Sequence, residues 1–186
     1  MQQLMMEADV ANRAAERDLP SGYFFQRFDG SNDAVTAWKT IMAEPPFLAL
    51  EDSEECYRRM ILEYPDCIPT EDIWFICNER GERVASITTI TKKDGSGYVH
   101  MVKARASEQG KGLGHAMARY ALRVFAERGV ERVVLTTDDF RLPAVKTYLS
   151  AGFLPVIYED PDSDMEKRWT DVLARLGLEN TERVYH

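Results

Sequence analysis

The sequence has few of the side chains that hold metal ions or build disulfide frameworks. Its three cysteines are odd in number and lack Cys-x-x-Cys spacing, and its three histidines stand far apart without a cluster of other ligands around them. These six residues are Cys56, Cys67, Cys77, His100, His115 and His186. We therefore predict neither a structural disulfide nor a metal site.

Long apolar runs and long basic runs are also absent. No segment approaches the roughly 20 apolar residues of a membrane span, and residues 1–19 carry charges where a signal peptide would have an apolar core. The 23 basic and 31 acidic residues give a formal charge of -8, which argues against a nucleic-acid-binding surface. We expect a cytoplasmic protein without membrane or nucleic-acid partners, whose electric field favours cationic acceptors.

The pattern that is present is that of a single α/β domain. With 186 residues, of which 45% are apolar, the chain is long enough for one substantial core. Period-2 and short apolar runs predict strands near 23–28, 73–78, 83–90, 98–104, 133–136 and 153–158, with a final strand near 182–185. Helical periodicity predicts helices near 32–42, 52–64, 113–125, 143–149 and 165–176.

Residues 109–114, Gln-Gly-Lys-Gly-Leu-Gly, lie between a predicted strand and a predicted helix. Three glycines in five residues allow tight turns that converge backbone N–H groups, and a helix N-terminus adds partial positive charge. The spacing excludes a P-loop, because Arg105 stands where its first glycine would be and Lys111 is followed by glycine. A dinucleotide fingerprint is disfavoured, because His115 takes the place of its third glycine.

The pattern that fits is Gln/Arg-x-x-Gly-x-Gly/Ala, which resembles the pyrophosphate-binding motif of the GNAT superfamily of acyl-CoA N-acyltransferases. A second stretch, with Ala144 four residues before Tyr148 and then Gly152-Phe153, is similar to the second signature of that family. The resemblance implies a mixed central sheet of about six or seven strands flanked by helices. We expect residues 1–20 to be an N-terminal extension and residues 21–186 to be the GNAT-like domain, with a C-terminal helical insertion near 163–176.

The resemblance also implies acetyl-CoA as acyl donor. In this family pantetheine pairs with the backbone of the strand before the glycine loop, and the diphosphate lies in the loop. Carried over to this sequence, the cofactor-binding residues are Val102, Lys103, Ala104, Gln109, Gly110, Lys111, Gly112, Leu113 and Gly114. The implied reaction is direct attack of a small-molecule or peptide amine on the bound thioester, and a homodimer is compatible with the pattern.

Two side chains are predicted to carry the proton transfers. The family pattern implies that Tyr148 protonates the departing thiolate. Strand alternation places His100 on the same face as Tyr98 and Val102, and an imidazole titrates in the range that a general base needs. The family also has a β-bulge at this strand, which implies a free backbone N–H for the developing oxyanion near Met101 or Val102.

Other interpretations stay open at this point. Arg141 stands where the family often has an asparagine that contacts pantetheine, so that contact is in doubt. A binding module that senses acyl-CoA without turnover predicts the same glycine loop. A nucleotide-binding domain unrelated to CoA is a third reading. The sequence does not identify the acceptor, because a fold alone does not fix a substrate.

Overall fold

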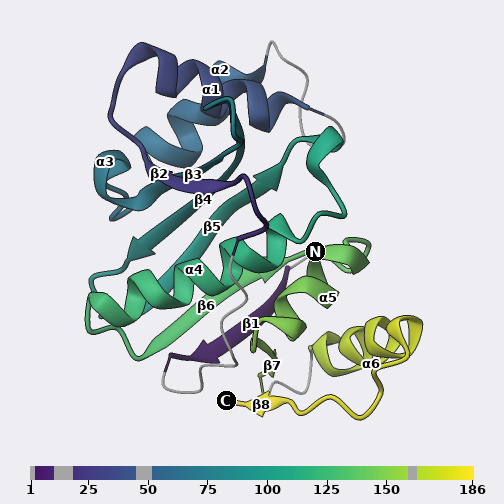
Figure 1. Ribbon diagram of the computed structural model, residues 1–186. Coiled ribbons are helices and arrows are strands. Elements are labelled where there is room, and N and C mark those ends of the chain that lie inside the picture. Colours follow the sequence, from purple (N-terminus) through teal and green to yellow (C-terminus); the bar gives the residue numbers. More distant parts are fainter. Residues whose placement is uncertain (1–2, 11–18, 45–51, 159–162) are drawn as a thin grey trace.

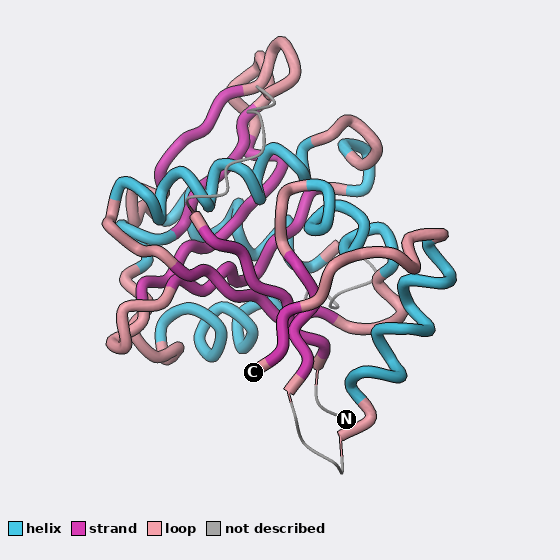
Figure 2. Tube along the Cα trace, turned by 90° about the horizontal axis from the view of Figure 1, so that it is seen from below, coloured by secondary structure: helices cyan, strands magenta, loops and turns pink. Residues whose placement is uncertain are grey.

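The computed structural model describes residues 3–10, 19–44, 52–158 and 163–186, and these form one eight-stranded sheet with helices on both sides (Figures 1 and 2). The strand order is β2-β3-β4-β5-β6-β1-β7-β8. The β5–β6 and β7–β8 pairs are parallel and the other pairs are antiparallel, so the sheet is mixed. The predicted α/β class is confirmed, with eight strands. Their bounds are β1 Leu4–Asp9, β2 Phe24–Arg27, β3 Ile73–Cys77, β4 Arg83–Thr91, β5 Gly97–Ala104, β6 Arg132–Thr137, β7 Leu154–Ile157 and β8 Val184–Tyr185.

Two hydrophobic clusters cover the two faces of the sheet. Adjacent residues Phe75 and Ile76 of β3 belong to different clusters, as the alternation of side chains along a strand requires. The cluster that contains Phe75 packs under α1, and the one that contains Ile76 packs under α4. The helices are α1 Asn32–Ala43, α2 Ser53–Tyr57, α3 Pro69–Asp72, α4 Leu113–Glu127, α5 Leu142–Ser150 and α6 Met165–Leu176.

Strand β1 corrects the predicted start of the sheet. The first strand was expected at residues 23–28, but Leu4–Asp9 forms an earlier one within the segment expected to be an extension. It lies between β6 and β7, antiparallel to both, with Leu4 opposite Thr137 and Asp9 opposite Arg132. Its even-numbered residues are buried because they point into the core, which is the period-2 pattern of a strand.

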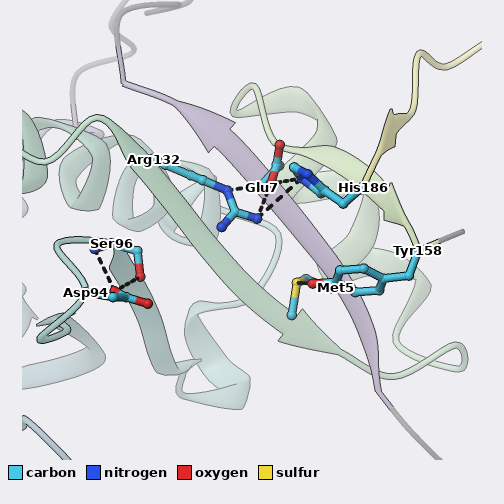
Figure 3. A network of polar contacts seen from close by, with 7 residues as sticks. All are labelled: Met5, Glu7, Asp94, Ser96, Arg132, Tyr158 and His186. Carbon is cyan, nitrogen blue, oxygen red and sulfur yellow. Dashed lines mark hydrogen bonds and ion pairs between the residues drawn. The ribbon is translucent and has the colours of Figure 1, made fainter.

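Side chains reinforce the position of β1. Glu7 accepts hydrogen bonds from Arg132 Nε at 2.8 Å and Nη2 at 2.6 Å, and its Oε2 lies 2.9 Å from His186 Nε2 (Figure 3). Tyr158, just after β7, donates to Met5 Sδ at 2.8 Å. The strand therefore ties β6 on one side to the chain around β7 and β8 on the other.

The helix predicted over residues 52–64 changes its hydrogen-bonding pattern midway. It begins as α2 and continues as a π-helical turn, Arg58–Leu62, that we call η2. The predicted loop around Pro69 contains the short helix α3, which begins at that proline because its missing N–H is not needed in a first turn. The helix predicted over residues 165–176 is confirmed as α6, and it packs beside α5 and β7 (Figure 1).

Candidate active site

The glycine loop joins β5 to α4 and has the backbone that its sequence predicts. Gly110 and Gly112 have φ angles of 78° and 85°, which residues with side chains rarely adopt. Gly112 is also the N-cap of α4, a helix of 15 residues. A Cβ atom at either glycine would meet no other atom within 4 Å. The loop therefore leaves open space beside the N-terminus of α4, which fits a diphosphate group.

Strand β5 contains a β-bulge where the sequence analysis expected one. Its register with β4 shifts between the Ser86–Lys103 and Thr88–His100 pairs, so β5 carries one residue more than β4 between these positions. Met101, within the bulge, has a φ angle of 48°. Such a bulge turns part of the strand's backbone away from its neighbour.

The same strand diverges from β6. The register of β5 with β6 runs only from Gly97 to Val99, whereas β5 continues to Ala104. Within the described residues, the β6-facing edge of β5 after Val99 thus has no strand paired to it. An unpaired edge can accept an extended ligand by backbone hydrogen bonds.

A cleft of about 620 Å³ brings the glycine loop, the end of β5 and helix α5 together. Most of the predicted cofactor-binding residues line it, and so does Tyr148, whereas His100 and Lys111 are not among its lining residues. The predicted residues in the lining are Val102, Lys103, Ala104, Gln109, Gly110, Gly112, Leu113, Gly114 and Tyr148.

Tyr148 lies near the C-terminal end of α5 and is 9% exposed. Its ring packs edge-on against Phe153, with 6.0 Å between the ring centroids. Burial raises the pKa of its phenol to about 12, although the charge of Arg141 acts in the opposite direction. None of the described residues exchanges a hydrogen bond with its hydroxyl. The hydroxyl is therefore protonated at neutral pH and available to a ligand in the cleft.

His100 lies in a different environment, although it is also 9% exposed. Its Nε2 is 3.0 Å from the Met60 carbonyl oxygen, which can only accept, so Nε2 carries the hydrogen. The ring stacks on Tyr64 with 4.2 Å between centroids, and Tyr98 lies beside both. We call Tyr64, Tyr98 and His100 the aromatic cluster. Burial lowers the pKa of His100 to about 4, so the imidazole is neutral at pH 7.

The two lysines of the predicted set have protein partners. Lys103 Nζ donates to the carbonyl oxygens of Met42, at 3.1 Å, and of Glu44, near the end of α1. Burial lowers its pKa. Lys111 Nζ lies 2.9 Å from Glu108 Oε2 and 3.3 Å from the Tyr23 hydroxyl. In the glycine loop, the backbone faces the cleft while the one cationic side chain of the motif is paired with a carboxylate.

Several residues of the cleft wall were not predicted from the sequence. Arg141, noted only as a departure from the family pattern, lines the cleft as the N-cap of α5, and its Nε lies 2.8 Å from Asp138 Oδ2. Phe140 beside it is 69% exposed. Phe140 lies in a loop whose shape no local motif encodes. The charge of Arg141 at a motif position was the one sequence signal for this part of the cleft wall.

The fold and the cleft define the class: an α/β protein in which a glycine loop, a helix N-terminus and an open strand edge meet at one cleft. A model described as the acetyltransferase (GNAT) family matches residues 34–153. This match covers more than half of the 186 residues, and the chain belongs to that family.

Curated relatives are distant and longer than this chain. A mycothiol acetyltransferase from Beutenbergia cavernae is 27% identical over 146 residues, which are 74% of this chain and 47% of that protein. A mycothiol acetyltransferase from Thermomonospora curvata is 31% identical over 91 residues, 47% of this chain and 31% of that protein. The chain thus spans less than half the length of these relatives.

Solved structures share the fold at low sequence identity. A GCN5-related N-acetyltransferase from Sphaerobacter thermophilus superposes with a TM-score of 0.63 and 20% identity, covering 82% of this chain and 47% of that one. A GNAT-family acetyltransferase from Colwellia psychrerythraea gives a TM-score of 0.63 and 14% identity, covering 83% of this chain and 53% of that one.

Among the described residues, no helix combines the length and apolar character needed to cross a membrane.

Proposed function

We propose that the chain is an N-acetyltransferase that moves an acetyl group from acetyl-CoA to an amine by direct attack in a ternary complex. The observation that carries this proposal is the single cleft in which the glycine loop, the open edge of β5 and the Tyr148 hydroxyl meet. These are the three features that a protein needs to hold a diphosphate, an extended pantetheine arm and a leaving sulfur.

The residues present fit acetyl-CoA. The open space at Gly110 and Gly112, beside the N-terminus of α4, suits the diphosphate, and the backbone of Val102 and Ala104 suits the amides of pantetheine. When bound, acetyl-CoA supplies an acyl group already activated as a thioester. The work of this chain is then to align the acyl carbon with the amine and to meet the charge that develops.

Tyr148 is the proposed general acid. Its phenol keeps its proton across the neutral range because burial raises its pKa to about 12. The hydroxyl can donate a hydrogen bond to the departing sulfur, a role worth roughly 10² to 10⁴ in rate. A backbone N–H at the Met101 bulge is the proposed donor to the developing oxyanion.

His100 is the predicted base for the amine, and the experiment on it must separate two outcomes. An alkyl amine with a pKa near 10.4 is protonated to all but about one part in 10³ at pH 7. The Nδ1 lone pair of neutral His100 could accept its proton, but a group with a pKa of about 4 holds that proton weakly. The substitution His100→Gln keeps a donor for the Met60 carbonyl. Loss of kcat with unchanged acetyl-CoA affinity supports the role of His100 as base. Unchanged kcat assigns the removal of the amine proton to water.

A mass-spectrometric screen with acetyl-CoA tests the proposed function. The panel should hold simple amines, aminoglycosides, amino acids, peptide N-termini and the acceptor of mycothiol acetyltransferases. An adduct of one acetyl group, with matching release of free CoA thiol, supports the proposal. Binding of acetyl-CoA without acetylation of any panel member contradicts it.

The second candidate is an acyl-CoA-binding module without turnover. The observation that favours it is the hydrogen-bonded, stacked position of His100, because an active site normally presents its base to the substrate. This candidate predicts that acetyl-CoA raises the melting temperature while thiol release stays at the uncatalysed rate. Stabilisation by nucleotides without acyl-CoA would contradict both candidates.

A further inference from the structure

Gln3 precedes the first strand, yet its side chain contacts the end of β6 and the segment that leads into α5, the helix that carries Tyr148. Strand β1 runs antiparallel to β6, and Leu4 is opposite Thr137, the last residue of β6. The residue before β1 therefore comes next to the residues that follow β6, which lead into α5. This topology brings an N-terminal side chain to the helix that carries Tyr148.

The Gln3 side chain bridges two polar groups across this junction. Its Nε2 donates to Asp138 Oδ1 at 3.0 Å, and its Oε1 accepts from Thr136 Oγ1 at 3.0 Å. An ionised carboxylate only accepts, so the amide nitrogen must face Asp138 and the amide oxygen must face Thr136. The orientation of this amide is thus fixed by its partners.

Each end of the bridge continues to one further side chain. Because the Thr136 hydroxyl gives its one hydrogen to Gln3, the Tyr98 hydroxyl at 3.0 Å must be the donor to Thr136. At the other end, Asp138 Oδ2 holds Arg141 Nε at 2.8 Å. The result is a chain of three hydrogen bonds and one ion pair from Tyr98 through Thr136, Gln3 and Asp138 to Arg141.

Both ends of this chain act on the Tyr148 phenol. Burial is the largest cause of the raised pKa of Tyr148; the charge of Arg141 comes next and lowers that pKa, and Tyr98 raises it. Arg141 also lines the cleft with Tyr148. The positions of Tyr98 and of the cleft residue Arg141 are therefore linked through one glutamine.

We propose that Gln3 is a positioning residue for acyl transfer: by bridging Thr136 and Asp138 it fixes Tyr98 and, through Asp138, holds Arg141 in the cleft wall that Tyr148 also lines. The proposal rests on the proposed acetyltransferase function. It follows from the need to keep donors and charges fixed around the leaving group, since groups that must reorganise during reaction stabilise a transition state less.

The test compares Gln3→Ala with a control on the same strand. Gln3→Ala should lower kcat by about threefold to tenfold, the effect of losing one bridging hydrogen-bonded side chain, with KM for acetyl-CoA unchanged. Glu7→Gln weakens the contacts of β1 with Arg132 and His186, and should lower thermal stability without lowering kcat. In a Tyr148→Phe background the Gln3→Ala effect on kcat should vanish, because it acts through that phenol.

The isosteric variant Gln3→Glu separates positioning from packing. When ionised, its carboxylate faces that of Asp138, with Thr136 and Arg141 as the other groups of the bridge, so kcat should fall at pH 8. When protonated it can donate to Asp138 as glutamine does, so kcat relative to wild type should recover as the pH falls. A packing role predicts wild-type kcat at every pH.

The outcomes are distinguishable. An active wild type whose kcat is unaffected by Gln3→Ala, or a Gln3→Ala effect that persists in the Tyr148→Phe background, overturns the positioning role alone. A wild type that acetylates no amine overturns the proposed function, and the positioning role with it.

Discussion

Tyr148 and His100 are equally buried, each 9% exposed, yet their surroundings differ. Tyr148 lines the cleft and its hydroxyl has no hydrogen-bond partner among the described residues. His100, in the aromatic cluster, donates to the Met60 carbonyl and is stacked on Tyr64. Burial alone therefore does not mark a catalytic side chain. What distinguishes Tyr148 is a hydroxyl that the described part of the chain leaves without a hydrogen-bond partner, beside a cleft.

The largest effect is expected from Tyr148→Phe. The change removes only the hydroxyl, so the cleft keeps its shape and acetyl-CoA should bind with wild-type affinity. Loss of the proposed proton donor should lower kcat by roughly 10² to 10⁴. Assays of CoA thiol release measure kcat, and calorimetry measures the affinity for acetyl-CoA. A variant that keeps more than half of the wild-type kcat would remove the distinction between Tyr148 and His100.

The glycine loop and the far end of α4 give a matched pair for the second prediction. Gly112, before α4, and Gly129, after it, have φ angles of 85° and 72°, and a Cβ atom at either would meet nothing within 4 Å. Alanine at either position should cost about 1 kcal/mol of stability, because L residues disfavour this backbone. Only Gly112 lines the cleft.

Gly112→Ala should therefore weaken acetyl-CoA binding by about tenfold, a loss of roughly 1.4 kcal/mol, whereas Gly129→Ala should leave the affinity unchanged. Calorimetric titration with acetyl-CoA and chemical denaturation provide the two measurements. Equal affinities for the two variants would show that the loop does not hold the donor.

The third prediction concerns the aromatic cluster and pH. His100 has a pKa of about 4 in the folded protein and an ordinary value of 6.5 when unfolded. Its contribution to stability is complete above pH 6.5 and is lost as the pH falls toward 4, because the unfolded chain takes up the proton first. The difference between the two values corresponds to about 3 kcal/mol at pH 4 and below.

Denaturant unfolding between pH 8 and pH 4 measures this loss, and His100→Gln should make the pH dependence shallower. Because the pKa of His100 is low, the profiles of kcat/KM against pH for wild type and for His100→Gln should agree near pH 6.5, with no ionisation that is present in wild type alone. Observing one would mean that His100 titrates as an exposed histidine, and the contrast with Tyr148 would lose its basis.

The sequence predicted the backbone of the glycine loop better than the partners of the site's side chains. The loop at Gly110 and Gly112 could be recognised because its backbone requires residues without a Cβ atom, and such a requirement is visible in the local sequence. Strand β1 was not predicted, because Met5 interrupts the alternation of Leu4, Met6 and Ala8 with the polar residues Glu7 and Asp9.

Long-range partners could not be predicted from spacing. His100 binds a carbonyl 40 positions away along the chain, and Lys111 meets Tyr23 across 88 positions. Gln3 reaches Asp138 across 135 positions. These contacts depend on which strands become neighbours, and that depends on the whole sheet. Residues that bind through the backbone are thus easier to assign from sequence than residues whose role depends on a distant partner.

Lys111 carries the smallest predicted effect and completes the comparison within the glycine loop. It is the one cation of the motif, but it is 2.9 Å from Glu108 and lies outside the cleft lining. Because its charge is already paired, Lys111→Ala should weaken acetyl-CoA binding by at most about threefold, the effect expected of an exposed ion pair. Glu108→Gln, which releases Lys111 toward the cleft and removes a carboxylate from its wall, should instead tighten binding.

Calorimetry at two salt concentrations tests both variants, since a charge effect shrinks with ionic strength. A loss of tenfold or more in Lys111→Ala would mean that the side chain leaves Glu108 to bind the diphosphate, so that backbone and side chain of the loop would act together on the donor.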